Sequence, residues 1–432
     1  MKYAFKHTIS ISLFLLLLFL NFSLFYKVLG QTTSTSTDDL ISKIEERNNQ
    51  IKQLEQEINQ YNSEVDNASK QGVTLQNTLK TLDLTKKKIT TDINLTDTKI
   101  NKTVLTIEQL NNEIKKTKDS IDVDREAIIN AIQDTRILED MNIIQIILSN
   151  KNISDIWNEI DSIKEIQNVI RDRSKELAIL KAEMETKQIA LTGQKKSLVN
   201  LKQDLNGKKQ AVLSTTQEKA TLLAQTKNKE ETFKQLVKTK EEQKAQFEKE
   251  LYEYESQLNL TVDINKYPAP LNGILSWPLD SIFITQKFGK TVDAKKLYVS
   301  GSHNGVDFRA SVGTRVKNVL DGVVVGTGNT DLYPGCYSFG KWLMVKHDNG
   351  LSTIYGHLSV ISASVGQRLS TGDLIGYSGN TGYTTGPHLH ISVYATQGVR
   401  IERYVNSIGC KQATLPLADI KAYLDPLAYF PN

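Results

Sequence analysis

Proline is absent from residues 38–258, and the same stretch contains only three glycines. All 8 prolines lie at or beyond Pro268, and 20 of the 24 glycines lie at or beyond Gly273. Both residues interrupt helices and supply turns, so their distribution predicts a long helical half followed by a turn-rich globular half. A length of 432 residues also exceeds what one hydrophobic core usually holds, which favours at least two structural units.

A strong excess of either charge is missing as well. The chain has 53 Lys and Arg against 49 Asp and Glu, a formal net charge of +4. Nucleic-acid binders need a basic field, so we expect no nucleic-acid partner. With 24% charged and 39% hydrophobic residues, the composition also excludes a multi-span membrane protein and a disordered tail.

The one long apolar run lies at the N-terminus. Lys2 and Lys6 precede the mostly apolar residues 9–25, and the small residue Gly30 ends the segment. This order is typical of a secretory signal, and the run also approaches the ~18 residues of a membrane anchor. We therefore predict an extracytoplasmic protein, with residues 1–30 either cleaved as a signal peptide or retained as the only membrane contact. The polar residues 31–37 are interpreted as a spacer.

Cysteine is scarce, with Cys336 and Cys410 as the only two. In an oxidising compartment an even number predicts one disulfide, with two separate thiols as the alternative. Each cysteine lies in a segment longer than a minimal connection, at residues 327–340 and 399–414. If the cysteines pair, they tie these two insertions together.

Residues 38–258 carry a coiled-coil pattern. From Ile44 to Ile121 apolar residues recur every seven positions, with a second row three residues later, and a similar stretch runs from Leu177 to Leu258. Two such rows form the seam of a left-handed coiled coil. We predict helices over about 39–135 and 165–258. Their equal lengths favour an antiparallel hairpin over the alternative, a parallel dimer of extended helices.

Residues 138–169, between the two arms, are richer in bulky apolar side chains, among them Ile146, Ile147, Leu148 and Trp157. Soluble monomers rarely expose such a patch, so one hypothesis is a partner-docking tip. The other hypothesis is that these side chains pack the small helices that turn the corner.

After a linker at residues 259–272, residues 273–432 show short apolar runs between turn residues, which predicts an all-β domain. Five of the six histidines fall within residues 303–390. His303 and Asp307 are four residues apart, and His388 and His390 would face the same side of a strand. Two imidazoles and one carboxylate are the ligand set of hydrolytic zinc, which leaves other histidines for acid–base catalysis.

These motifs, together with Trp277-Pro278-Leu279, Phe288-Gly289 and residues 381–390, resemble the LytM/lysostaphin-type zinc metallo-endopeptidases of the peptidoglycan over residues 273–432. The resemblance implies a duplicated-hybrid-motif β fold with an open groove.

The resemblance also implies roles for single residues. His303, Asp307 and His390 would bind one Zn²⁺. His357 and His388 would be catalytic, orienting the attacking water and stabilising the tetrahedral oxyanion. The remaining histidine of the domain, His347, is treated as structural. Separately, Lys and Tyr residues are candidates for glycan or peptide contact, with ordinary loop packing as the alternative: Lys290, Tyr298, Tyr377 and Tyr383.

The whole order, an α + β multidomain chain of export signal, coiled-coil hairpin and LytM-type domain, resembles EnvC-like regulators of cell-division hydrolases and their catalytic relatives. The implied function is an exported zinc metallo-endopeptidase that hydrolyses peptide cross-links of bacterial peptidoglycan during cell separation or wall remodelling. The coiled coil would control it, with an FtsEX-like membrane complex bound at the tip. The alternatives are a non-catalytic activator of a separate cell-wall amidase and a purely structural spacer. The intact set of histidines and Asp307 favours the enzyme.

Overall fold

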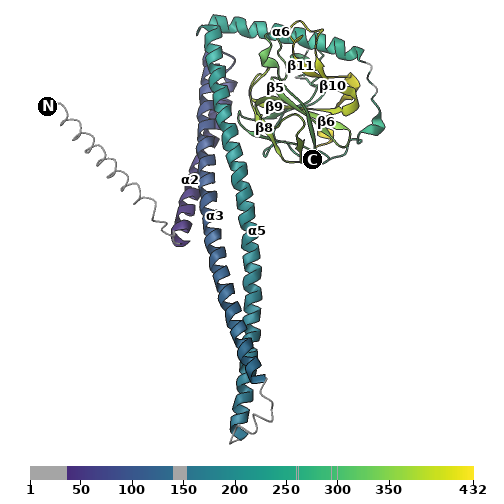
Figure 1. Cartoon of the computed structure of the whole chain (residues 1–432). Helices are drawn as coiled ribbons and strands as arrows, with labels where there is room; N and C mark the ends of the chain where they lie inside the picture. Colours follow the sequence, from purple (N-terminus) through teal and green to yellow (C-terminus); the bar gives the residue numbers. More distant parts are fainter. Residues whose placement is uncertain (1–36, 140–152, 259, 261, 293, 299) are drawn as a thin grey trace, which may run out of the picture. The chain divides into compact units, whose positions relative to one another are not determined.

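The computed structural model describes residues 37–139, 153–258 and 260–432, apart from residues 261, 293 and 299. The chain divides into two compact units, one with residues up to 46 and 105–191, the other with residues 47–104 and 192–432. As the sequence predicts, long helices precede an antiparallel all-β domain (Figure 1). The long helices are α2 (Thr37–Lys70), α3 (Leu75–Glu139), α5 (Ile153–Thr226) and α6 (Glu230–Gln257).

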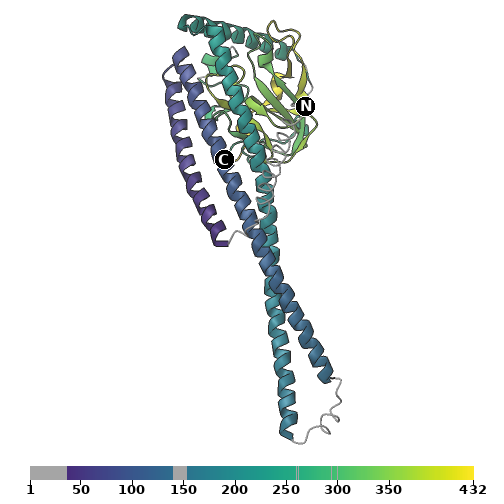
Figure 2. The same ribbon diagram turned by 60° about the vertical axis from the view of Figure 1, so that its left-hand side comes forward.

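Helices α3 and α5 run antiparallel (Figure 2). Within the first unit, Lys187 of α5 lies 3.6 Å from Glu113 of α3. Within the second, Lys219 of α5 lies 2.5 Å from Asp83 of α3. Within the first unit, Arg173 of α5 also pairs with Asp124 of α3, so the partner numbers rise along α3 as they fall along α5 and the two helices are antiparallel there.

The first arm is not one helix. Gly72 has a φ of +94°, and the chain turns at residues 71–74 between α2 and α3. Glycine adopts this left-handed conformation without the clash of a Cβ atom. α2 then runs back along α3, with Lys99 donating to Glu55 at 3.0 Å. The prediction of a continuous helix over residues 39–135 is wrong for this reason.

The second arm is interrupted as well. Lys227 and Asn228, with φ values of +49° and +57°, form a left-handed corner between α5 and α6. The prediction of a continuous helix over residues 165–258 is therefore also wrong. The apolar face of α6 contacts the β domain, where the ring of Tyr254 lies 5.3 Å from that of Tyr404.

Several predictions concern parts of the chain that lie outside the described residues. These are the signal or anchor at residues 1–30, nearly all of the spacer, residues 140–152 of the tip with Ile146, Ile147 and Leu148, and the side chain of Trp157. Of the helices that the structure describes, none combines the length and the apolar character that crossing a membrane requires.

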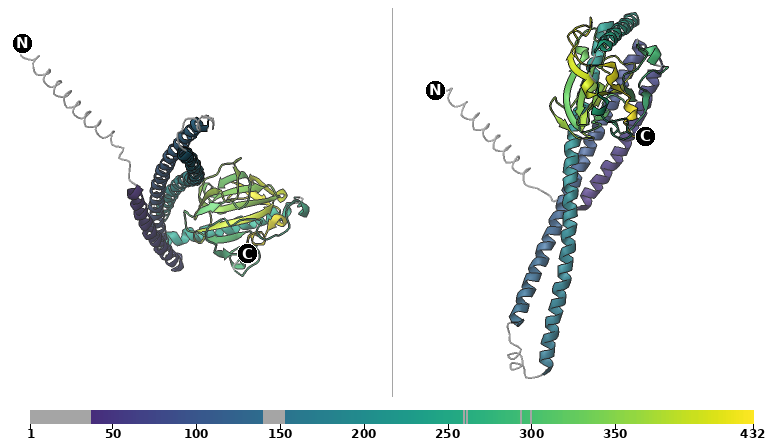
Figure 3. Two further views of the ribbon diagram at one scale, coloured as in Figure 1. Left: turned by 90° about the horizontal axis from the view of Figure 1, so that it is seen from below. Right: turned by 90° about the vertical axis from the view of Figure 1, so that its right-hand side faces the viewer.

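The β domain, drawn in green to yellow in Figure 3, is built around one antiparallel sheet. Its strand order is β1-β2-β9-β6-β5-β4-β7, with β8 paired to β3 and β6, and β12 paired to β9. β10 and β11 form a separate hairpin. β6 is central, and all its residues from Leu351 to Val360 are buried. The strands are β1 (Ile284–Gln286), β2 (Val306–Arg309), β3 (Arg315–Lys317), β4 (Gly322–Asn329), β5 (Lys341–His347), β6 (Leu351–Ile361), β7 (Arg368–Leu369), β8 (Leu374–Ser378), β9 (His388–Ala395), β10 (Val399–Arg403), β11 (Thr414–Ala418) and β12 (Tyr423–Leu424).

Two hydrophobic clusters stabilise the domain. The first packs fully buried side chains of the main sheet, including Phe308 and Tyr355, against the C-terminal Phe430. The second surrounds Trp342 and includes Phe247 of α6, so this helix contributes to the core of the domain. Such burial is the main favourable contribution to folding.

Candidate metal centre

The centre is built on the pairing of β2 with β9. In this register Asp307 lies directly opposite His390, and Arg309 lies opposite His388. Oδ1 of Asp307 lies 2.8 Å from Nδ1 of His390 and 3.7 Å from Nε2 of His388. The two histidines therefore face the same side of β9, as their spacing predicts.

His303 reaches the same point from the segment before β2. Its backbone forms an isolated bridge with Gly289, and Nδ1 lies 3.2 Å from the carbonyl oxygen of Lys287. A ring that donates from Nδ1 keeps the lone pair on Nε2. Nε2 lies 3.2 Å from Nδ1 of His390 and 3.4 Å from Oδ1 of Asp307.

These three donor atoms fit a zinc ion. Ligands about 2.0–2.1 Å from a tetrahedral zinc lie about 3.3 Å from one another, and the observed separations of 2.8, 3.2 and 3.4 Å surround that value. His303, Asp307 and His390 are all buried, and two neutral imidazoles with one carboxylate are a common hydrolytic set. The outer nitrogens of both histidines are also hydrogen-bonded, His303 to a carbonyl and His390 to Ser392, as expected for metal-ligating imidazoles.

The electrostatics keep the carboxylate ionised. Burial alone would raise the pKa of Asp307, but its contacts with the imidazole rings of His303 and His390 hold that pKa well below its usual value. Burial lowers the pKa of His390, which favours the neutral imidazole that a metal ion binds.

Gly305 is required by close packing inside the first motif. A Cβ atom at this position would lie 2.4 Å from the carbonyl oxygen of Ile391 and 2.6 Å from Cε1 of His390. The glycine therefore lets the two segments that supply donors approach each other.

His357 and His388 form a pair beside the three donors. Their ring centroids are 4.5 Å apart. Nδ1 of His357 lies 2.8 Å from the carbonyl oxygen of Thr381, and Nδ1 of His388 lies 2.8 Å from that of Gly386. Each ring therefore presents Nε2 as an acceptor. Burial, together with the nearby His388 and His390, lowers the pKa of His357 well below its usual value.

The backbone of His357 has a φ of +57°. This left-handed conformation is unfavourable for a residue with a Cβ atom, and such strain gathers at functional sites. The neighbouring Gly356 allows Phe339 and His390 to approach, since an added Cβ atom would lie 3.3 and 3.4 Å from them.

His347 lies away from this group. Its Nδ1 is 3.1 Å from the carbonyl oxygen of Asp321, and its Nε2 is 2.9 Å from the hydroxyl of Thr353. Burial lowers the pKa of His347 to about 4. The side chain is therefore a neutral, hydrogen-bonded part of the interior.

A cleft of about 300 Å³ opens on the donors. Tyr298 and Tyr383, two of the candidate contact residues, line it. Tyr377 does not: it is fully buried and packs against Ile89 and Ala211. Its proposed contact with glycan or peptide is therefore wrong, because helices α3 and α5 cover the ring. Lys290 is exposed and is not among the lining residues.

Helix α6 supplies one wall of this cleft, which sequence reasoning missed. The lining residues from α6 are Lys244, Phe247, Glu248, Leu251, Tyr252 and Glu255. Phe247 and Leu251 continue the apolar spacing that predicts a coiled-coil seam, and the same spacing suits any apolar partner surface. The left-handed corner at Lys227 and Asn228 carries no proline or glycine that could have signalled the change.

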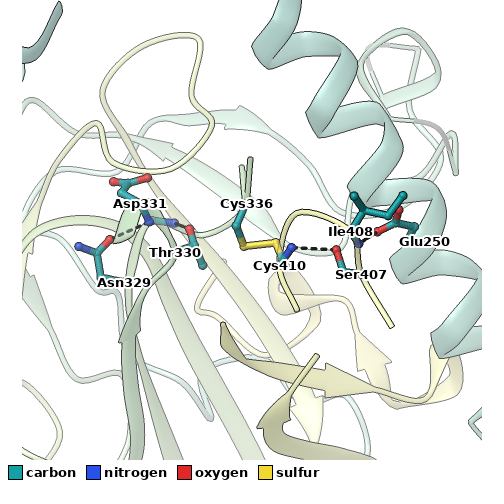
Figure 4. Close-up of a disulfide and its surroundings, with 9 residues drawn as sticks. Glu250, Asn329, Thr330, Asp331, Cys336, Ser407, Ile408 and Cys410 are labelled. Carbon is teal, nitrogen blue, oxygen red and sulfur yellow. Dashed lines mark hydrogen bonds between the residues drawn. A yellow bond between two sulfur atoms is a disulfide. The ribbon is translucent and has the colours of Figure 1, made fainter. Parts of the chain in front are cut away.

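The two insertions provide the surface on which α6 packs. Cys336 and Cys410 form a disulfide with Cα atoms 4.6 Å apart. Beside it, Glu250 of α6 accepts a hydrogen bond from the backbone of Ile408 at 3.1 Å (Figure 4). The rings of Phe247 and Tyr404 meet edge to face, 6.2 Å apart.

At the C-terminal end of α6, Glu255 is buried. Its Oε1 accepts from the backbone N–H of Ala418 at 3.1 Å and from the hydroxyl of Tyr423 at 2.8 Å. Burial raises the pKa of Glu255 to about 8.

Part of the chain is similar to known peptidases. Residues 301–403 match Peptidase family M23. Glycyl-glycine endopeptidase ALE-1 of Staphylococcus capitis is 38% identical over 122 residues, which cover 28% of this chain and 30% of that protein. Peptidoglycan DD-endopeptidase ShyA of Vibrio cholerae serotype O1 is 49% identical over 88 residues, which cover 20% of this chain and 19% of that protein. The matches thus span less than a third of either relative.

Among solved structures, a zinc containing peptidase from Vibrio cholerae is similar at 31% identity. The match covers 28% of this chain and 36% of that chain, with a TM-score of 0.25.

Proposed function

We propose that the C-terminal domain, whose residues 301–403 match Peptidase family M23, is an exported zinc metallo-endopeptidase of the LytM/lysostaphin type that hydrolyses peptide cross-links of bacterial peptidoglycan. The convergence of His303, Asp307 and His390 on one point carries this proposal. The peptidoglycan endopeptidases among its relatives support the substrate class and an extracytoplasmic location.

We propose that His303, Asp307 and His390 hold the zinc ion. When bound, zinc supplies Lewis acidity that lowers the pKa of water and polarises a carbonyl group. The ionised carboxylate of Asp307 contributes negative charge to the ligand set. Hydrogen bonds from Nδ1 of His303 to the carbonyl oxygen of Lys287 and from Nε2 of His390 to the hydroxyl of Ser392 fix the two imidazole rings before any ligand arrives.

His357 and His388 are proposed to carry the proton transfers. The buried, neutral His357 can accept a proton from the attacking water at Nε2. Once Nε2 of His388 has taken up a proton from solvent, the imidazolium can donate a hydrogen bond from Nε2 to the oxyanion that develops on the scissile carbonyl. Both rings are held by backbone carbonyls, so their orientation is set in advance.

We further propose that α6 restrains the enzyme. Six residues of this helix line the cleft, and Phe247, at 4% exposed, anchors it to the domain. A peptide cannot enter the space that these side chains occupy. In this proposal, a membrane partner of the FtsEX kind acts on the helical half during cell separation or wall remodelling and draws α6 away.

Digestion of purified peptidoglycan tests the function. The full exported chain, an Asp307→Ala chain and a Phe247→Asp chain are compared in zinc buffer, and released muropeptides are identified by mass. Phe247→Asp places a charge in the apolar contact of α6, so we expect at least about tenfold faster release than from wild type. The fragments should be peptide-cleaved, and adding Asp307→Ala to Phe247→Asp should abolish them.

No cleavage by any of these chains, with zinc bound to the wild type, would contradict the endopeptidase. Stimulation of a separate cell-wall amidase by the same chains would then favour the activator.

A further inference from the structure

Two tyrosine rings hold the ammonium group of Lys244 inside the cleft. Its Nζ atom lies 4.7 Å from the ring centroid of Tyr298 and 4.8 Å from that of Tyr383. The side chain of Lys244 is only 13% exposed, and Nζ is 2.9 Å from Oε1 of Glu248. The negative faces of aromatic rings attract a cation, and the attraction strengthens where water is excluded.

This slot adjoins the candidate metal centre. The ring of Tyr298 stacks on His303, with centroids 5.2 Å apart and planes inclined by 13°. Tyr383 lies in the segment that leads into β9 and lines the same cleft. Both tyrosines belong to the β domain, whereas Lys244 belongs to α6, so the slot remains when the helix departs.

A second feature of the cleft indicates that it takes a peptide. Oε1 of Gln286 accepts a hydrogen bond from the Tyr298 hydroxyl at 3.4 Å. Nε2 of Gln286 is buried and has no hydrogen-bond partner among the residues that the structure describes. A buried donor without a partner is costly, and a carbonyl of a bound peptide would satisfy it.

We propose that Tyr298 and Tyr383 form a subsite for a positively charged side chain of the substrate, and that Lys244 occupies it as a substrate mimic while α6 is docked. The ligand is a peptide with a free primary ammonium group close to the bond that is cut, and one of its carbonyl oxygens accepts from Gln286. The inference rests on the proposed function, because it defines the chemistry of the peptide. It also explains why α6 and substrate exclude each other.

Binding of two short peptides tests the subsite. The probes are acetyl-Gly-Lys-Gly-amide and the same peptide with its lysine acetylated, which removes the charge. The full chain carries Lys244→Ala to remove the occupant and Phe247→Asp to release the helix. The affinity of each peptide is measured by isothermal titration calorimetry in the presence of a chelator, which removes zinc and so prevents hydrolysis of the peptide. We expect the charged peptide to bind about tenfold more tightly than the acetylated one.

Further variants of that chain locate the effect. Tyr383→Leu should reduce the preference to less than about twofold, whereas Tyr383→Phe, which keeps the aromatic face, should retain it. The matched control is a chain with Lys249→Ala alone. Lys249 is exposed on the same helix, so this chain keeps the slot filled and should show no preference.

Equal affinity for the two peptides, or a preference that survives Tyr383→Leu, would overturn the inference. Digestion of peptidoglycan with zinc is measured separately on the same chain. Cleavage of the wall without a preference for the charged peptide would support the proposed function and contradict the proposed subsite. A preference without cleavage would support the subsite and contradict the endopeptidase.

Discussion

Asp307 and His390 are 83 residues apart in the sequence, yet Oδ1 of one lies 2.8 Å from Nδ1 of the other across the β2–β9 pair. Replacing Asp307 by Ala removes one donor and leaves buried imidazoles without their carboxylate. We expect zinc affinity to fall by roughly 100-fold or more, measured as the metal content of the purified chain. Asp348→Ala removes an exposed carboxylate paired with Arg368 and should keep full zinc content. Stoichiometric zinc in Asp307→Ala would contradict the three-residue site.

Gly305→Ala tests the close approach of the two motifs. The added Cβ atom would meet the carbonyl oxygen of Ile391 at 2.4 Å and the ring of His390 at 2.6 Å. We expect a displaced His390, weaker zinc binding and a loss of about 1–3 kcal/mol in the free energy of unfolding. Gly386→Ala is the matched control, because its Cβ atom meets nothing within 4 Å. Equal zinc affinity for both variants would show that the strand pair accommodates the methyl group.

The buried carboxyl of Glu255 predicts a pH dependence of stability. Its folded pKa of about 8 lies above the usual 4.5, so the folded state binds the extra proton, and stability falls as the pH rises from about 4.5 to 8. Glu255→Gln lacks this titration, and its Oε1 can still accept from Ala418 and Tyr423. Between pH 5.5 and 8.5 the wild type should lose roughly 3 kcal/mol more than the variant, measured by urea unfolding. An identical loss in both chains would assign the pH dependence to other groups.

The disulfide should stabilise the surface that α6 contacts. Cys336 and Cys410 are separated by 74 residues, and closing a loop of that length contributes up to about 4 kcal/mol. Replacing both cysteines by Ser should lower the melting temperature and speed proteolysis of α6. Reductant should have the same effect on the wild type and none on the double variant. An unchanged wild-type melting temperature in reductant would contradict this prediction.

We expect His347 to contribute to the free energy of unfolding and not to zinc binding. His347→Ala leaves the hydroxyl of Thr353 and the carbonyl of Asp321 without their imidazole partner, at a cost of about 1–3 kcal/mol. The folded pKa of His347, about 4, lies below the usual 6.5. The free energy of unfolding of the wild-type protein should therefore decrease as the pH falls from 6.5 to 4. Zinc content should be unchanged. A large loss of zinc in a folded variant would place His347 in the metal centre.

The sequence indicated which side chains meet wherever the contact is local. His388 and His390 are two residues apart on one strand. Because side chains alternate between the two faces of a β-sheet, this spacing places both on the same face. The pairing of Asp307 with His390 depends on a long-range strand register, which no local pattern encodes. The grouping of Asp307 with His390 was predicted only from the resemblance of the motifs to those of the LytM/lysostaphin-type enzymes.

The position of α6 shows the opposite case. Phe247, Leu251 and Tyr254 continue the apolar spacing of the coil, and that spacing reports an apolar face without naming its partner. Gly72 was visible as an interruption, yet a glycine within a helix and a glycine that reverses the chain look alike in sequence. Both breaks became evident only from backbone angles and contacts.

The left-handed backbone at His357 has an evolutionary consequence. Position 357 is strained for any residue with a Cβ atom, so a histidine persists there only while selection for its imidazole outweighs that strain. In a relative with the same fold that lacks the catalytic role proposed for His357, Gly or Asn at this position would relieve the strain. If His357 has the proposed role, the amino acid at this position distinguishes catalytic from non-catalytic homologues.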